Sequence, residues 1–513
     1  MSYGKKTILL IAIVTLIRCI IASTIELGND EVYYRIYASH LQWNYFDHPP
    51  MVAWLIRFTT ANLFFDSEIF IRLGAIVSAA VTTWLLYLTG KKLSTPKTGF
   101  YAAAIYTATV YGSIIAGTFI LPDSPQMICW TGGLYLLTCI TDSKNIRSSK
   151  KRKIILFGIV AGIGMLCKIH TSFLWLGFLL YIFLYNRKWL QQPVLYLSGA
   201  LTILFFYPVI KWNIDNQFIT FLYHSGRVNI VNSGFDITNF FRFAGGQIFY
   251  CNPVIFVLMI LALTAALKNQ LPVSISQKRL LLLTSLPLII IAAIISLFRN
   301  VLPHWPGPAY TGLILLTACY FTKRRKNNQS EEWWLPKPLI IANGLLIAII
   351  MAGVFCINLI PGTLGKKEGL QKGEGDFTLD MYGWTKLKAG FEKIYQQDTS
   401  AGIIKPGAFL ISNKWFPAAH LDHYVAAPLQ IDFIAIGELY DIHQYAWLNK
   451  TRRHLIKGDN AYCIVPSNNF FEPAKVYSSL FENIKAISTI PQWRNGTICR
   501  SFYIYRLTNY KGE

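Results

Sequence analysis

Apolar stretches of about 20 residues, long enough to cross a lipid bilayer, recur from the start of the chain to about residue 360. The plainest of them are residues 7–25, 69–90, 98–116, 193–212, 280–298 and 338–360. Of the 513 residues, 53% are hydrophobic and only 14% are charged, whereas a soluble globular protein carries roughly 25% charged residues. The sequence therefore predicts a polytopic α-helical membrane protein.

The formal net charge of +22 could suggest a nucleic-acid-binding protein, but the distribution of charge excludes that class. Residues 1–360 hold 30 Lys and Arg against 12 Asp and Glu, and the remaining residues hold 18 against 14. Most of the excess lies in short loops between apolar runs, such as Lys91–Lys97, Lys144–Lys153 and Lys323–Lys326. Basic clusters of this kind mark cytoplasmic loops, so we expect no nucleic-acid partner.

With the basic clusters in the cytoplasm, the chain makes about eleven crossings from a cytoplasmic N-terminus to an external C-terminal region. The predicted spans are residues 7–25, 69–90, 98–116, 125–141, 154–168, 172–186, 193–212, 251–267, 280–298, 306–322 and 338–360. Lys168 and His170 interrupt the pair 154–168 and 172–186, so a broken or re-entrant hairpin is the alternative there. The outer loops are then 26–68, 117–124 and 213–250.

The composition changes after residue 360, where apolar runs give way to polar sequence. Residues 381–395 show the spacing of an amphipathic helix, and residues 408–411, 462–465 and 501–506 are short β-type runs. We therefore expect a transmembrane catalytic domain over 1–360 and a small periplasmic α/β domain over 361–513. Cys463 and Cys499 each lie in or beside a β-type run, and we expect a disulfide between them if their strands are neighbours.

Several charged residues lie in or beside the outer loops. Asp30 and Glu31 precede Tyr34 in an amphipathic helix; alternatively, Asp30 is only the helix N-cap and Glu31 complements the helix dipole. Asp123 lies at the lip of two apolar spans, where a charge is costly without a partner, unless it simply caps the next helix. Lys168 lies at another lip, where it either contacts a lipid phosphate or extends toward the headgroups.

The remaining candidates are basic or aromatic. Arg227 lies in the third outer loop, and His304 precedes Trp305, which we expect to be an interface anchor. His48 lies in the motif Asp47-His48-Pro49-Pro50. The alternatives are a packed loop histidine for His304 and a structural turn for the His48 motif. The sequence contains no Gly-rich phosphate loop, Walker motif or tight Cys/His cluster, which disfavours an enzyme driven by ATP or a nucleotide sugar.

Taken in order, these motifs resemble the bacterial dolichyl-phosphate-mannose-protein mannosyltransferase-like family, which includes the aminoarabinose transferase of lipid A. The segments that carry the resemblance are Asp30-Glu31-x-Tyr33-Tyr34, Asp47-His48-Pro49-Pro50, Pro122-Asp123-x-Pro125, Lys168, Pro208-Val209-x-x-Trp212-Asn213 and Tyr382-Gly383-Trp384. The resemblance runs across nearly the whole chain. It implies a GT-C fold, a polyprenyl-phosphate-linked sugar donor and inversion at the anomeric carbon.

The resemblance also implies roles for single residues. Asp30 and Asp123 match the acidic positions of the family's first and second outer loops, so both are expected to be catalytic, with Asp30 taking the proton of a hydroxyl acceptor. Lys168 and His48 would contact the donor phosphate; some relatives have a lysine in place of His48, so its contact would depend on pH. The predicted substrate-binding residues are Glu31, Tyr34, His48, Lys168, Arg227 and His304. Whether a divalent metal cation binds at Asp30, Glu31 and Asp123 stays open.

The sequence thus predicts a glycosyltransferase of the bacterial inner membrane. It would transfer a sugar from undecaprenyl phosphate to lipid A or another envelope glycan on the periplasmic face, among membrane lipids. A protein O-mannosyltransferase is the alternative within the same class, and a lipid or sugar transporter or flippase is the alternative from a different class. A transporter would be expected to show related halves and charges near the membrane midplane, whereas the acidic residues here cluster in outer loops.

The predicted orientation can be tested with a reporter that is active only outside the cytoplasm. The reporter should be active when fused after residue 361 and inactive when fused within Lys144–Lys153 or Lys323–Lys326, because basic loops stay in the cytoplasm. The opposite result at any of these sites would overturn the orientation.

Overall fold

The computed structural model describes residues 1–142, 148–231, 233–326 and 335–512. Two compact units make up the chain: Met1–Ala22 with Gln42–Ile349, and Ser23–Leu41 with Ile350–Glu513. Residues 143–147, most of which belong to the predicted basic loop Lys144–Lys153, lie outside the described residues. Residues 327–334, which follow Lys323–Lys326, also lie outside them.

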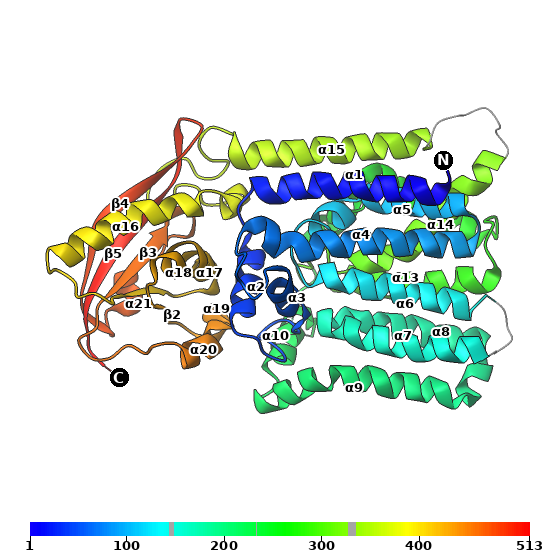
Figure 1. The fold of residues 1–513 in the computed structure, drawn as a ribbon, viewed down its shortest axis with the longest axis horizontal. Helices are drawn as coiled ribbons and strands as arrows, with labels where there is room; N and C mark the ends of the chain where they lie inside the picture. Colours follow the sequence, from blue (N-terminus) through cyan, green and yellow to red (C-terminus); the bar gives the residue numbers. More distant parts are fainter. Residues whose placement is uncertain (143–147, 232, 327–334, 513) are drawn as a thin grey trace. The chain divides into compact units, whose positions relative to one another are not determined.

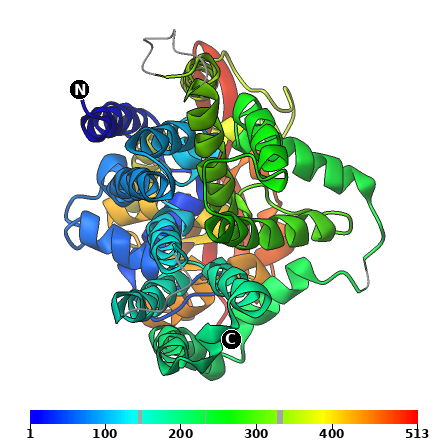
Figure 2. The ribbon, with the colours of Figure 1, turned by 90° about the vertical axis from the view of Figure 1, so that its right-hand side faces the viewer.

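The first unit is helical, and its long helices run side by side in Figure 1 and are seen nearly end on in Figure 2. Its helices are α1 (Tyr3–Thr24), α3 (Met51–Thr59), α4 (Glu68–Leu93), α5 (Pro96–Thr107), α6 (Asp123–Ile140), α7 (Ser148–Cys167), α8 (Ser172–Tyr185), α9 (Pro193–Asp215), α10 (Ile219–Val228), α11 (Ile237–Tyr250), α12 (Pro253–Leu267), α13 (Ile275–Ile295), α14 (Tyr310–Lys326) and α15 (Lys337–Asn358). The last of them, α15, continues into the second unit. In lipid every backbone polar group must be satisfied internally, which a helix achieves within its own segment.

Ten of the eleven predicted spans coincide with one of these helices, whereas the predicted span 98–116 is broken: α5 ends at Thr107 and a separate π-helical turn covers Tyr111–Ile115. Five helices in the described part of the chain, α1, α4, α9, α13 and α15, are long and apolar enough to cross a membrane by themselves. A sixth candidate is the pair α11 and α12, which bend by 97° at their junction. The chain is thus a multipass membrane protein, and the number of eleven crossings stays a prediction. The interruption at Lys168 separates two helices, α7 and α8, and a short 3-10 turn (Ile169–Thr171) lies between them.

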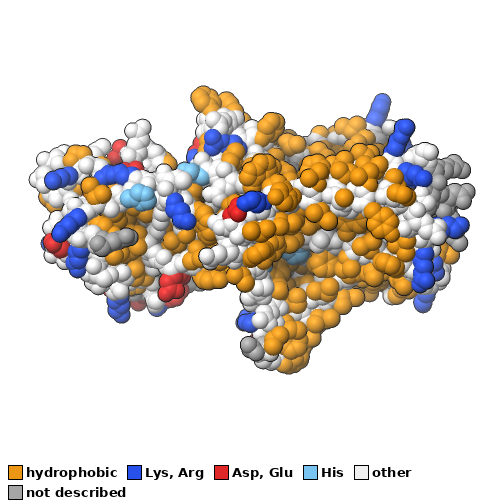
Figure 3. Space-filling model, turned by 90° about the horizontal axis from the view of Figure 1, so that it is seen from below, with side chains coloured by type: hydrophobic (Ala, Val, Ile, Leu, Met, Phe, Trp, Pro, Cys, Tyr) orange, Lys and Arg blue, Asp and Glu red, His pale blue; other side chains and the backbone are white. Residues whose placement is uncertain are grey.

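The surface of the first unit suits a lipid environment. Apolar side chains cover much of it in Figure 3, and Lys and Arg gather at one end of the helices. Leu16 of α1 and Leu204 of α9 are 63% and 64% exposed, which a soluble protein surface would seldom repeat over whole helices. Small residues let helices approach closely inside the bundle. A Cβ at Gly158 of α7 would overlap the carbonyl oxygen of Ser198 in α9, and the Thr202 hydroxyl donates to the Gly158 carbonyl at 2.8 Å.

The second unit is an α/β structure around a five-stranded sheet. Its larger helices are α2 (Asn29–Ser39), α16 (Trp384–Ser400) and α17 (Trp415–Leu421), and its strands are β1 (Phe409–Ser412), β2 (Phe433–Ala435), β3 (Ala461–Pro466), β4 (Phe481–Arg494) and β5 (Thr497–Tyr510). The strand order is β2-β1-β3-β5-β4, with β1 parallel to both of its neighbours and β5 antiparallel to both of its own. A core that includes Phe409, Ile411 and Val465 lies against this sheet.

Three predicted β-type runs and the predicted amphipathic helix are confirmed as β1, β3, β5 and α16. The sequence reading missed β2, which has three residues, and β4, an edge strand with an interior proline, Pro491. The predicted disulfide is wrong, because Cys463 and Cys499 are both free thiols. Their strands are neighbours, but Cys463 lies opposite Tyr505, which is six residues, or about 20 Å, from Cys499 along β5.

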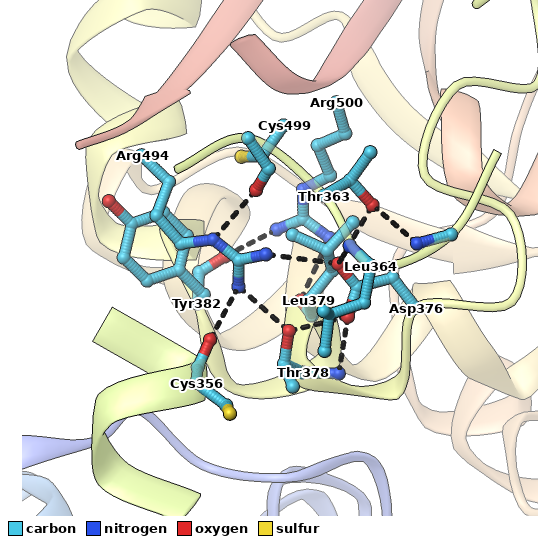
Figure 4. Close-up of polar contacts among 12 residues, drawn as sticks. Cys356, Thr363, Leu364, Asp376, Thr378, Leu379, Tyr382, Arg494, Cys499 and Arg500 are labelled. Carbon is cyan, nitrogen blue, oxygen red and sulfur yellow. Dashed lines mark hydrogen bonds and ion pairs between the residues drawn. The ribbon is translucent and has the colours of Figure 1, made fainter. Parts of the chain in front are cut away.

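A buried arginine joins the sheet of the second unit to the end of α15 (Figure 4). The Arg494 guanidinium pairs with the Asp376 carboxylate at 3.0 Å, and both side chains are fully buried. Arg494 also donates to the Thr378 hydroxyl and to the carbonyls of Cys356 and Ile357. These two carbonyls belong to the last turn of α15, where backbone acceptors lack partners within the helix. Within the second unit, Arg494 thus attaches the end of β4 to the last turn of α15.

Replacing this arginine should destabilise the protein, because Asp376 would keep a buried charge without its partner. We expect Arg494→Met to lower the free energy of unfolding by about 3–5 kcal/mol. The matched control is Arg453→Met, since Arg453 is 42% exposed and pairs with Asp432 at the surface; it should cost about 1 kcal/mol or less. Thermal unfolding of the full chain in detergent measures both, and equal midpoints would contradict this role of Arg494.

Candidate functional site

The first unit contains a buried ion pair at the start of α6. The Lys168 ammonium lies 2.7 Å from one carboxylate oxygen of Asp123, and the Tyr111 hydroxyl donates to the other oxygen at 2.9 Å. The Asp123 and Lys168 side chains are only 2% and 5% exposed. The N-cap of α6 is Pro122, and Asp123 lies in the first turn of this helix, so the alternative in which Asp123 is the cap is wrong. Because Lys168 points at Asp123, the alternative of a lysine extended to the headgroups is also wrong.

The imidazoles of His48, His170, His224 and His304 lie near enough to interact electrostatically with this pair. The His48 and His224 rings lie 5.8 Å apart, and His224 contacts the Asp47 carbonyl at 2.6 Å. The structure thereby brings the first outer loop beside α10. We refer to the group formed by His48, Asp123, Lys168, His170, His224, Arg227 and His304 as the basic cluster.

The ring of Trp305 contacts two members of the basic cluster, Arg227 and His170. The Arg227 guanidinium lies 5.2 Å from the centre of the Trp305 ring, and the His170 ring lies 6.1 Å from it on another element. Trp305 therefore acts as a packing surface for a cation in addition to any role as a membrane anchor. Among the described residues, no carboxylate pairs with Arg227.

The histidines of the basic cluster are neutral at physiological pH. Burial lowers the pKa of His48 well below its ordinary value, and the nearby positive charges of Lys168 and Arg227 lower it further. Burial likewise lowers the pKa of His170 to about 3 and that of His304 to about 4, with Lys168 contributing to both. A neutral imidazole can still donate one hydrogen bond. The expected pH-dependent charge on His48 is therefore absent near pH 7, and the fixed cations are Lys168 and Arg227.

The other predicted site residues belong to the second unit and lie on α2. The N-cap of this helix is Gly28, and the Glu31 carboxylate accepts a hydrogen bond from the Gly28 amide at 2.9 Å. The alternative in which Asp30 is the N-cap is therefore wrong, whereas Glu31 does complete the first turn. Asp30 is exposed, and Tyr34 is buried, with its ring 5.5 Å from that of Tyr37. The substrate contacts predicted for Glu31 and Tyr34 stay predictions.

The segment before Asp30 is bound to the start of α16. Glu26 accepts hydrogen bonds from the Trp384 and Thr385 amides at 2.7 and 3.0 Å. These amides lack partners within their helix. Gly383, which precedes them, has a φ of +79°, a conformation that glycine adopts without strain. This requirement explains the glycine of the Tyr382-Gly383-Trp384 motif.

The Asp380 carboxylate also binds the segment that precedes Asp30. It accepts a hydrogen bond from the Asn29 side chain at 2.9 Å, and burial raises the pKa of Asp380 to about 6. Arg500 opposes this rise, and the neighbouring charges of Asp376 and Asp30 add to it.

Sequence patterns missed several residues of these sites: Tyr111, Glu26, Asn29 and Asp380. Each contacts a residue that is distant in sequence, so no local spacing identifies it. In the described ranges, no group of three or more His, Cys, Asp or Glu side chains is arranged to hold a metal ion.

Parts of this sequence are similar to those of known glycosyltransferases. Residues 47–212 match the family model for dolichyl-phosphate-mannose-protein mannosyltransferase, and this segment contains His48, Asp123 and Lys168. A curated relative, the lipid A galacturonosyltransferase RgtD of Rhizobium johnstonii, is 21% identical over 296 residues. The match covers 57% of this chain and about 60% of that protein.

The fold is found in solved structures. ArnT from Cupriavidus metallidurans superposes with a TM-score of 0.60 when bound to undecaprenyl phosphate and 0.62 in the apo state. Each comparison has 13% sequence identity and covers 97% or 98% of both chains. The predicted GT-C fold and the resemblance from which it was drawn are confirmed.

The raised pKa of Asp380 predicts how stability depends on pH. The folded state keeps a proton on Asp380 up to about pH 6, whereas the unfolded chain loses it near pH 4. This stabilisation is complete below pH 4 and is lost as the pH rises through 6. Asp380→Asn should therefore gain stability relative to the wild type between pH 5 and pH 8. Thermal unfolding at both pH values measures the effect, with Asp432→Asn at an exposed position as the control; a parallel pH dependence in wild type and Asp380→Asn would contradict it.

Proposed function

We propose that this chain, a multipass membrane protein with the fold of ArnT, is a glycosyltransferase that uses a polyprenyl-phosphate-linked sugar as its donor. The basic cluster carries the proposal, because it gathers two fixed cations and four neutral imidazoles beside one buried carboxylate. Since a sugar on a lipid phosphate is already activated, such an enzyme needs no nucleotide. The matching family model and the undecaprenyl phosphate in one ArnT structure support this donor class.

The basic cluster suits a phosphate that departs with negative charge. Arg227 has no carboxylate partner among the described residues, and its guanidinium offers several donors in a fixed plane. Neutral imidazoles, such as those of His48 and His304, can donate further hydrogen bonds without adding charge. Donors and cations held in advance around a developing negative charge stabilise the transition state. The donor phosphate is therefore assigned to Arg227 and the histidines.

The Asp123–Lys168 pair has a different role in this scheme. Lys168 is held by Asp123, so it contributes a partly neutralised cation whose position is fixed. Removal of either partner would leave an uncompensated buried charge, at a cost of about 3–5 kcal/mol. Asp123 thus keeps Lys168 in place for the phosphate and acts on the donor side.

Asp30 is assigned to the acceptor. Its carboxylate is exposed at the first turn of α2, while its neighbour Glu31 is used in the helix cap. If the acceptor is a hydroxyl, Asp30 takes its proton as the bond to the anomeric carbon forms and the bond to the phosphate oxygen breaks. If the acceptor is itself a phosphate, it is already ionised, and Asp30 positions it.

The acceptor proposed first is lipid A, because the curated relative RgtD is described as acting on lipid A. A protein acceptor is the second candidate, since the family model describes protein mannosyltransferases. The proposed location is the bacterial inner membrane, with the N-terminus in the cytoplasm and the C-terminal unit in the periplasm, as the basic loops indicate.

Mass spectrometry of lipid A, surface glycans and envelope proteins from a strain that lacks the gene tests the proposal. We expect one sugar to be missing and to return on complementation, and its mass identifies the donor as a hexose, hexosamine, uronic acid or aminopentose. Unchanged glycans together with a change in transport of a lipid would instead support a transporter.

The role of Asp30 can be separated from a structural role. Asp30→Asn keeps the size of the side chain and leaves the Gly28–Glu31 cap intact, so expression and thermal stability should stay nearly unchanged. Turnover of a hydroxyl acceptor should fall by roughly a hundredfold or more, because a general base is lost. The measurement is the rate at which the missing sugar returns to its acceptor in complemented cells at matched expression. Near-wild-type turnover would end the catalytic assignment.

A further inference from the structure

The helix that carries Asp30 is packed into the second unit, although it is more than 300 residues away in sequence from the rest of that unit. Residues Ser23–Leu41 cluster with Ile350–Glu513 rather than with the remainder of the first outer loop. Most of α2 is buried: Val32, Tyr33, Ile36 and Tyr37 are at most 1% exposed. Asp30, at the start of the helix, is exposed.

Glu26 and Asn29, which lie on either side of the turn before α2, both form hydrogen bonds with the C-terminal part of the second unit. Glu26 uses its two carboxylate oxygens to accept three hydrogen bonds, from the Trp384 and Thr385 amides and from the Thr385 hydroxyl at 2.6 Å. A carboxylate at a helix N-terminus is also favoured by the helix dipole. Asn29, directly before Asp30, donates to Asp380 at 2.9 Å. The backbone on the N-terminal side of Asp30 therefore has two side-chain attachments.

Backbone and ring contacts complete the attachment. The Leu27 amide donates to the Tyr424 hydroxyl at 2.9 Å, and the His420 ring contacts the Leu27 carbonyl at 3.1 Å. On the C-terminal side of Asp30, the Tyr33 hydroxyl accepts a hydrogen bond from the backbone N–H of Gln444 at 2.9 Å. The Tyr33 ring lies 4.9 Å from that of Trp415. Asp30 thus lies within a short segment that is attached before and after it.

We propose that Glu26 and Asp380 are positioning residues for Asp30: through Glu26 at the start of α16 and through the Asn29–Asp380 bond, the C-terminal unit sets where the Asp30 carboxylate stands. The inference rests on the proposed function, in which Asp30 works on the acceptor. A displacement of about 1 Å in a reacting group can cost a hundredfold in rate, so loss of either attachment should impair transfer although neither residue touches the substrate.

The test uses the full chain with Glu26→Ala, Glu26→Gln and Asn29→Ala, each alone and combined with Asp30→Asn. The first measurement is the rate at which the missing sugar returns to its acceptor in complemented cells at matched expression. The second is binding of undecaprenyl phosphate to the purified protein in detergent. Glu392→Gln is the matched control, because Glu392 lies on the same helix α16 and, among the described residues, accepts a side-chain hydrogen bond only from Gln396.

We expect Glu26→Ala and Asn29→Ala to reduce the transfer rate at least tenfold, while affinity for undecaprenyl phosphate changes less than twofold. Glu26→Gln should be less impaired than Glu26→Ala, since an amide oxygen still accepts one hydrogen bond from the helix. If Glu26 acts through Asp30, the double variant Glu26→Ala/Asp30→Asn should be no slower than Asp30→Asn alone, because effects through one group are not additive.

Three outcomes would overturn the inference. Wild-type transfer by Glu26→Ala, with Asp30→Asn inactive, would contradict the positioning role and leave the proposed function intact. Multiplied effects in the double variant, or an equal loss of undecaprenyl phosphate binding, would show a general structural role for Glu26. Wild-type transfer by Asp30→Asn would overturn both the inference and the role of Asp30 in the proposed function.

Discussion

A polar or charged group that leaves water must find a partner, and this constraint governs both units of the chain. In lipid the backbone meets it by forming helices. Two buried ion pairs meet it in the side chains: Asp123 with Lys168 at 2.7 Å and Asp376 with Arg494 at 3.0 Å. Because an unpaired buried charge costs several kcal/mol, each pair fixes the position of the elements that supply it. The catalytic proposal depends on the first pair, and the attachment of the sheet to α15 depends on the second.

The same constraint distinguishes the two cations of the basic cluster, Lys168 and Arg227. Lys168 is held by Asp123 at 2.7 Å, which fixes its position for the proposed donor phosphate. Arg227 lacks a carboxylate partner in the described ranges. Burial beside two cations keeps the imidazoles of the basic cluster neutral, so the phosphate of the donor would meet hydrogen-bond donors without excess positive charge. This arrangement suits a phosphate that enters and leaves in each turnover.

Much of the fold could be predicted from local sequence, because a membrane span and a strand each have a short-range signature. Ten of the eleven predicted spans coincide with single α-helices, the span 98–116 being broken after Thr107, and three of the five strands were found. The missed strands have weak signatures: β2 is too short, and β4 is an edge strand with a proline. The disulfide prediction failed because spacing along the chain indicates which strands contain cysteines but not the register in which those strands pair, and Cys463 lies opposite Tyr505.

By itself, the sequence determined that the chain lies in a membrane, that it has many helices and a final α/β unit, and which short motifs carry charge at the ends of helices. These properties follow from composition and from periodicity within single elements. Only the tertiary structure decided which charges are paired. It showed that Asp123 holds Lys168, that Glu31 rather than Asp30 completes the cap of α2, and that Glu26 belongs to the start of α16. The physical reason is that hydrogen bonds and ion pairs act over about 3 Å in space, whereas their partners here lie between 3 and more than 350 residues apart in sequence.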